Sequence, residues 1–210
     1  MGSRVQEPVS DRHVGQRHLE RLVMLSDGVF AIAITLSAIE IKPVAQPGQT
    51  LWQIWSLPLL IYFLSFLLIG SIWASHRRMV AHLRDVDAVG TAINLLLLSL
   101  VALIPVVVRF VFEGLEQGQG LLVYALALAV TYTCLALFWA YVAFIARLAP
   151  DLPPVKARAW LLEMVAAPLL MLALALYDRH LRGGALALTL LGVALLLTKS
   201  WQGRRGRQRD

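Results

Sequence analysis

The chain has 210 residues, of which 59% are hydrophobic and only 15% are charged, and its mean hydropathy is +0.70. These values exclude an ordinary soluble domain and are typical of a polytopic membrane protein. The net charge of +6 comes without a pattern of stacking aromatics or base-reading side chains, so we expect no nucleic-acid partner. The single cysteine, Cys134, excludes a disulfide within these residues.

The first apolar stretch, residues 21–41, is long enough to cross a bilayer as a helix of about 20 residues. Its sequence, RLVMLSDGVFAIAITLSAIEI, has a serine and an aspartate in its first turns. An unpaired carboxylate at bilayer depth costs several kcal/mol, so we expect Asp27 to be buried against protein and close to a donor. A second interpretation stays open, in which Ser26 and Asp27 only cap a helix that begins at Gly28.

Projected at about 100° per residue, this stretch has one narrow apolar face interrupted by a single hydroxyl group, that of Thr35. Asp27 lies nearly opposite, on the face that carries the charge. The apolar face consists of Gly28, Val29, Ile32, Thr35, Leu36 and Ile39, with Glu40 at its edge.

Five further apolar stretches follow, separated by turn-rich or charged connectors. Tryptophans open and close the second stretch, as expected of interfacial anchors, and Pro105 predicts a kink in the third. Residues 76–87, which follow the second stretch, have the composition of a polar basic connector. The stretches are 51–75, 88–112, 121–145, 159–177 and 185–198, the last one extendable to Leu181 and Trp201. The sequence therefore predicts an all-α membrane protein with six transmembrane helices.

The distribution of basic residues predicts the orientation. Six spans place both termini on one side, and fifteen of the nineteen Lys and Arg residues fall on that side. By the positive-inside rule both termini are cytoplasmic. We accordingly divide the chain into a cytoplasmic N-terminal tail (residues 1–18), a six-helix transmembrane domain (19–201) and a basic cytoplasmic C-terminal tail (202–210).

This topology brings the end of the second span to the depth of Ser26 and Asp27. Trp73 and His76 are three residues apart there and share one side of the last turn. His76 can pair with the Asp27 carboxylate, and the Trp73 indole can donate a hydrogen bond to it. An equally open interpretation makes Trp73 an interfacial anchor and His76 a solvated loop residue.

Three other charged residues lie in or beside the apolar stretches. Glu40 sits at a helix C-terminus, where the helix dipole disfavours negative charge. It is either a solvated end residue paired with Lys42 or, in an oligomer, part of a carboxylate ring that concentrates cations at an outer pore mouth. Glu163 and Arg109 either snorkel or form interhelical pairs.

Motifs for catalysis are missing from the chain. It has no nucleotide-binding loop, no zinc-protease motif, no Cys/His cluster and no filter sequence of the TVGYG type. We therefore expect no enzyme, no cofactor and no metal site. The sequence also lacks the inverted repeat that transporters use, so we expect identical copies to assemble as a ring around the apolar face of the first span.

The stretch RLVMLSD, from Arg21 to Asp27, resembles the RxxxFSD signature that begins the first helix in the transmembrane protein 175 family of potassium channels. Leu25 stands where that family usually has phenylalanine, which leaves the polar part of the motif intact. Trp73 to His76 resembles the WxxH element at the end of the family's second helix. The resemblance covers the six-span chain in length and topology, with specific motifs in the first two spans.

The resemblance implies a homotetramer in which the first helix lines a central pore. Carried over by position, the pore-lining residues are four that the helical projection also places on the apolar face: Ile32, Thr35, Leu36 and Ile39. Rings of the three aliphatic side chains would constrict or dewet the pore, and a ring of threonine hydroxyls would offer oxygen ligands to a cation. The residues that would brace the first helix are Arg21, Ser26, Asp27, Trp73 and His76, although Arg21 projects close to the pore face.

We therefore expect a modestly selective potassium channel in a bacterial cell membrane, with potassium ions as the permeant species and the bilayer and further copies of the chain as partners. One alternative is a secondary transporter of a cation or small solute, against which the apolar face of the first span argues. The other is a non-conducting scaffold in which that span is only an oligomer interface. Replacing Ile32 or Leu36 with Asn should change conduction in a channel and only assembly in a scaffold.

Overall fold

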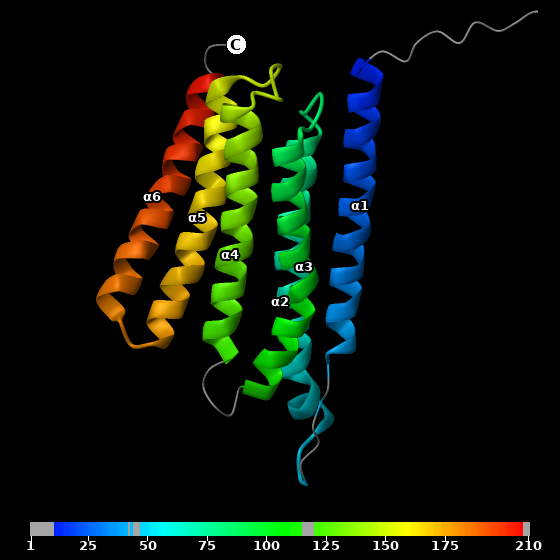
Figure 1. The fold of residues 1–210 in the computed structure, drawn as a ribbon. Coiled ribbons are helices and arrows are strands. Elements are labelled where there is room, and N and C mark those ends of the chain that lie inside the picture. Colours follow the sequence, from blue (N-terminus) through cyan, green and yellow to red (C-terminus); the bar gives the residue numbers. More distant parts are fainter. Residues whose placement is uncertain (1–10, 42, 44–46, 115–119, 208–210) are drawn as a thin grey trace, which may run out of the picture.

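The computed structural model describes residues 11–41, 43, 47–114 and 120–207, with side chains for 15–41, 43, 47–111 and 120–198. In these residues six α-helices run up and down in one bundle, so that the start of α1 and the end of α6 lie at the same end (Figure 1). The all-helical fold with six helices is therefore confirmed. The helices are α1 (Asp11–Ile39), α2 (Leu51–Val80), α3 (Ala88–Gly114), α4 (Gly120–Ala140) with a π-helical extension η1 (Tyr141–Ile145), α5 (Pro154–Asp178) and α6 (Arg182–Arg207).

Five of these helices are long and apolar enough to cross a membrane. Within the described residues the apolar part of α6 is shorter, Arg182–Thr198. The chain is thus a multi-pass membrane protein. The predicted boundaries between the transmembrane domain and the two tails fall inside helices, because α1 begins at Asp11 and α6 continues to Arg207. Residues 1–10 and 208–210 of the predicted tails, and Lys42, lie outside the described residues.

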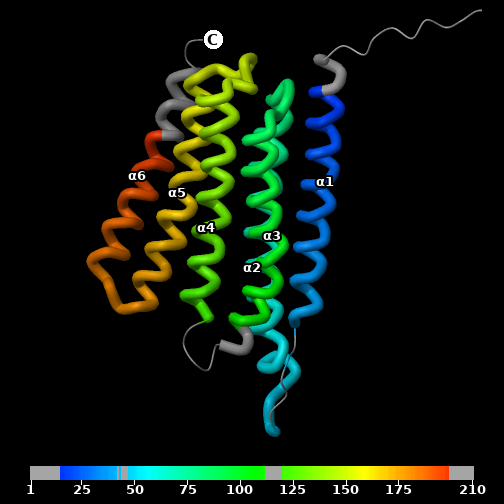
Figure 2. The backbone as a smooth tube through the Cα atoms, viewed as in Figure 1, coloured from blue at the N-terminus to red at the C-terminus, as the bar shows by residue number. Residues whose placement is uncertain are grey.

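The bundle has a middle and two edges. α3 and α4 occupy the middle, α1 packs on α2 and α3 at one edge, and α6 packs on α5 at the other (Figure 2). The core takes buried apolar side chains from α1 to α5, and many of the fully buried ones belong to α2, α3 and α4, among them Ile69, Ile72, Leu97, Ile104, Leu135 and Phe138. Burying a large aliphatic or aromatic side chain contributes roughly 1.5–3 kcal/mol in water, but in a bilayer close packing has to supply most of this attraction.

The second helix is longer than predicted. α2 runs to Val80, so the expected connector at residues 76–87 is wrong over its first five residues. The reason is burial, because His76, Met79 and Val80 continue the side of α2 that packs into the core. A Thr50–Gln53 capping box starts α2 at the other end. The kink predicted at Pro105, inside α3, stays a prediction.

Candidate functional site

The first helix has two sides that differ sharply in burial. One side packs against α2 and α3, and its side chains recur every three or four residues, as a helix with one buried stripe requires. On the opposite side the side chains of Ile32, Leu36 and Ile39 are 58%, 41% and 67% exposed. The buried stripe consists of Leu19, Leu22, Ser26, Phe30, Ala33 and Ser37.

The exposed face is smooth. A Cβ placed on Gly28 would meet nothing within 4 Å. The hydroxyl of Thr35 donates to the carbonyl oxygens of Ala31 and Ile32, each at 3.0 Å, which leaves its own oxygen able to accept a hydrogen bond or to contact a cation. Val29, which the projection placed on this face, is instead half-buried against the core. Glu40, at the end of α1, is also half-buried.

A buried polar network connects α1, α2 and α3 behind this face. The hydroxyl of Ser26 donates to the carbonyl of Leu22 at 2.8 Å and accepts a hydrogen bond from Nδ2 of Asn94 at 3.1 Å. The oxygen of that carboxamide accepts in turn from Nε2 of His76 at 2.7 Å. The side chains of Ser26, His76 and Asn94 are at most 1% exposed, so each hydrogen bond satisfies a group that water cannot reach.

The position of His76 corrects the predicted pairing with Asp27. The imidazole lies between the rings of Phe30 and Phe138, with centroids 5.7 and 5.8 Å away, and bonds to Asn94 instead of the carboxylate. Three residues along a helix correspond to about 300° of rotation. Trp73 and His76 therefore point about 60° apart, one to the flank of α1 and the other into the core.

The predicted hydrogen bond between Trp73 and Asp27 is present, with 2.8 Å between Nε1 and Oδ1. Asp27 itself is exposed at the flank of α1 and not buried as expected. It lies in a groove of about 560 Å³ between α1 and α2, which Glu20 and Arg77 also line. Because α1 begins at Asp11, the interpretation of Ser26 and Asp27 as helix caps is wrong.

Arg21 takes no part in either polar contact. It is exposed, and within the described part of the chain it forms no ion pair. At 3.6 residues per turn it lies eleven residues, or about three turns, before Ile32 and on the same side of α1. The structure therefore leaves Arg21 on the exposed face, while Ser26 and Asp27 are held by α3 and α2.

Asn94 is the main residue of this network that we did not predict. The only signal for it is a lone carboxamide in the apolar run of residues 88–112. For Glu163, the interhelical pair is the interpretation that holds, because its Oε2 accepts from Nη2 of Arg78 at 3.0 Å. Arg109 is exposed near the opposite end of the bundle.

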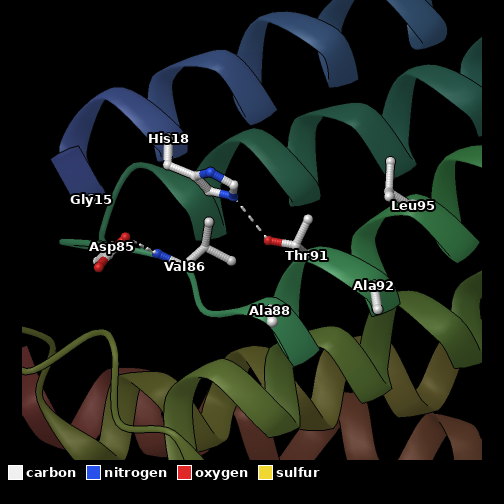
Figure 3. Close-up of a pocket in the computed structure, with 8 residues that line it drawn as sticks. All are labelled: Gly15, His18, Asp85, Val86, Ala88, Thr91, Ala92 and Leu95. Carbon is white, nitrogen blue, oxygen red and sulfur yellow. Dashed lines mark hydrogen bonds between the residues drawn. The ribbon is translucent and has the colours of Figure 1, made fainter.

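A recess of about 590 Å³ separates the beginnings of α1 and α3 (Figure 3). His18 of α1 reaches across it to Thr91 of α3, with 3.3 Å between Nε2 and Oγ1. Asp85, in the loop before α3, accepts a hydrogen bond from the backbone N–H of Val86. It also lies close to Gly15, because a Cβ added to Gly15 would be 2.5 Å from the Asp85 carboxylate. No predicted site residue lines this recess, and the described residues hold no group of three potential metal ligands.

Comparison with known proteins matches the part of the chain that builds this site. Residues 21–105 match the family described as the endosomal/lysosomal potassium channel TMEM175. A protein of Streptomyces collinus that is named as a potassium channel is 34% identical over 122 residues, which cover 56% of this chain and 59% of the relative. This chain therefore spans less than two thirds of that relative, and no solved structure matches it. The matched family is one of channels and not of enzymes. The matched residues contain the signature of α1 and the Trp73–His76 element of α2, so the match agrees with the resemblance that these motifs indicate.

Proposed function

We propose that this protein is a channel that conducts potassium passively through a central pore lined by α1 of several identical subunits. The observation that carries the proposal is the exposed apolar face of α1, which lies opposite the stripe that the subunit buries. Potassium as the permeant ion is supported by the family of residues 21–105 and by the name of the Streptomyces relative.

The charges beside this face favour a protein neighbour over lipid. Glu20 and Asp27 are exposed in the groove between α1 and α2, and Arg21 is exposed on the adjoining face of α1. Carboxylates at the edge of the hydrocarbon layer are costly to leave against lipid, so acids at this depth usually face protein or water. A second copy placed by rotation would cover the groove, and repeating that rotation closes a ring with α1 at its centre. Four copies is the number that the family resemblance implies.

In such a ring the exposed face of α1 becomes the pore wall. Ile32, Leu36 and Ile39 would form stacked apolar constrictions that exclude water when the pore is closed. The Thr35 oxygen would lie between them and contact a partly dehydrated cation when the pore is open. Glu40 would stand at the outer mouth and attract cations.

The buried network would then fix how the pore wall is presented. Ser26 is tied to Asn94, and Asp27 is tied to Trp73, about 100° further round the same helix. Two attachments at different angles resist rotation of α1 about its axis. Without them, the apolar face could turn away from the ring centre.

Flux measurements on reconstituted protein test the proposal. Liposomes loaded with potassium should release it passively when they contain the wild-type protein. Leu36→Asn should change the rate by about tenfold, which corresponds to ~1.4 kcal/mol in the barrier, because a polar side chain lets water into the constriction. Leu190→Asn, on α6, also alters an exposed leucine (62%) and is the matched control.

The control should leave the potassium flux unchanged. An absence of potassium flux from folded wild-type protein would contradict the channel. Equal effects of the Leu36 and Leu190 substitutions would contradict a pore lined by α1.

A further inference from the structure

Two adjacent arginines border a recess of about 280 Å³ near the end of α2. Arg77 and Arg78 contribute the only charges among its lining residues, which otherwise are Trp73, Ala74 and Ala81. The two alanines lie one turn before and one turn after the arginines, and their methyl groups leave the space open. The recess is thus small, cationic and partly aromatic.

Two contacts hold Arg78 at the recess, but the protein does not use all of its N–H donors. Its Nη2 donates to Glu163, and its guanidinium lies over the ring of Trp160 at 4.6 Å from the centroid. Its Nε is buried and has no hydrogen-bond partner among the described residues. The side chain as a whole is 33% exposed, so the guanidinium keeps further N–H donors for an incoming oxygen ligand beside the one given to Glu163.

Arg77 is positioned by an aromatic ring instead of a carboxylate. Its guanidinium lies 5.4 Å from the centroid of the Trp73 ring, whose own N–H is held by Asp27. Within the described residues it forms no ion pair, although Glu20 and Asp27 line the groove on its far side. Its N–H donors therefore remain available at the recess.

The recess lies where a bilayer places its phosphates. The apolar stretch of α2 ends at Ser75, so Arg77 and Arg78 follow directly beyond the hydrocarbon. Trp73 has the position of an interfacial anchor, and Lys156, 5.5 Å from the centroid of the buried Trp160 ring, adds a further positive charge on the same side. Basic pockets between helices at this depth are suited to anionic lipid headgroups.

We propose that this recess binds the phosphate group of an anionic phospholipid. Guanidinium groups bind phosphate oxygens with paired, charge-assisted hydrogen bonds, and two arginines line this recess. The lipid's acyl chains would run along the exposed apolar side of α2 that precedes the recess, which includes Leu60, Leu64 and Leu67. The proposal requires only that the protein lies in a membrane, so its outcome does not depend on whether the protein conducts ions.

Competition between two lipids tests it. Full-length protein is placed in nanodiscs with equal amounts of phosphatidylglycerol and phosphatidylcholine, and the lipids that remain bound after release into detergent are counted by native mass spectrometry. The wild type should retain phosphatidylglycerol preferentially. Arg77→Gln should lower that retention about fivefold, as the loss of one basic residue at an anionic surface predicts.

Two further variants separate the recess from general surface charge. Arg158→Gln removes an exposed basic residue near the start of α5 that does not line the recess, and it should leave the retention unchanged. Ala81→Leu keeps both arginines but fills the recess, and it should lower retention as Arg77→Gln does. This second variant also keeps the test valid if loss of an arginine prevents folding.

Four results would overturn the proposal. The first is equal retention of the two lipids by the wild type, and the second is an equal loss in Arg158→Gln. The third is displacement of the bound lipid by millimolar inorganic phosphate, which would assign the recess to a soluble anion. If Arg77→Gln separates subunits without changing the lipid bound per chain, the arginine is a subunit contact and the lipid site is excluded.

Discussion

At the scale of single residues, Asn94 has the most consequential position in the molecule. Its carboxamide donates to Ser26 of α1 and accepts from His76 of α2, while its own backbone belongs to α3. A carboxamide is suited to this place because it offers a donor and an acceptor from one planar group. Aspartate would keep only acceptors, and leucine would satisfy neither neighbour.

Asn94→Ala should therefore lower the free energy of unfolding by about 1–3 kcal/mol, because it leaves the buried imidazole without its partner. Ser99→Ala, on the same helix, removes an exposed hydroxyl and should change it by less than about 0.5 kcal/mol. Denaturant unfolding in detergent, followed by tryptophan fluorescence, measures both. Equal effects of the two substitutions would show that the network contributes nothing to stability.

At the scale of elements, the ion pairs Arg78–Glu163 and Arg84–Asp151 of the described residues connect helices or loops, and their surroundings differ. Arg78 and Glu163 join α2 to α5 with side chains that are both 33% exposed. Arg84 and Asp151 join two loops at a shorter distance, 2.6 against 3.0 Å, but their side chains are 59% and 69% exposed. Water screens the exposed pair, so burial and not distance should decide which pair contributes more.

Double-mutant cycles test this ranking with Arg→Gln, Glu→Gln and Asp→Asn substitutions. The coupling free energy of Arg78 and Glu163 should be on the order of 1 kcal/mol, and that of Arg84 and Asp151 close to zero. Thermal unfolding in detergent supplies the four stabilities of each cycle. A larger coupling for the exposed pair would refute the ranking.

At the scale of the whole molecule, α1 stands at the edge of the bundle (Figure 1). Its apolar side chains Ile32, Leu36 and Ile39 are left exposed there. In a membrane such a face contacts lipid or another protein. α6, at the opposite edge, also exposes leucines, among them Leu186 and Leu190, but the groove that Leu186 lines contains one basic side chain, Arg182, and no carboxylate. We therefore expect α1 to face further copies of the chain and α6 to face lipid.

Cysteine cross-linking in liposomes distinguishes the two edges. In a Cys134→Ala background, Ile39→Cys should form cross-linked species of up to four chains, because a ring brings the α1 helices together. Leu190→Cys, exposed to a similar degree, should remain largely uncross-linked. Electrophoresis without reducing agent reads out both. Cross-linking at position 190 but not at 39 would place the subunit contact on the wrong side for a pore formed by α1.

Much of this architecture could be predicted from the sequence. The number of helices, their approximate bounds and the exposed side of α1 follow from the length and periodicity of apolar residues, which are local properties of the chain. The signature around Asp27 is also local, and its residues alone indicate the family. The distribution of basic residues predicts the orientation in the membrane, because positive charge is retained on the cytoplasmic side.

The contacts within the site depended on the tertiary structure. Sequence spacing placed Trp73 and His76 beside Asp27, but only the packing of α2 against α1 and α3 decides that Trp73 reaches the carboxylate while His76 turns to Asn94. The extension of α2 through His76 also depends on the tertiary structure, because a polar residue continues a helix when its neighbours supply buried partners. Local sequence thus determined which segments cross the membrane, whereas the angles between helices decided which polar groups meet, because side chains 60° apart on one helix can face different neighbours.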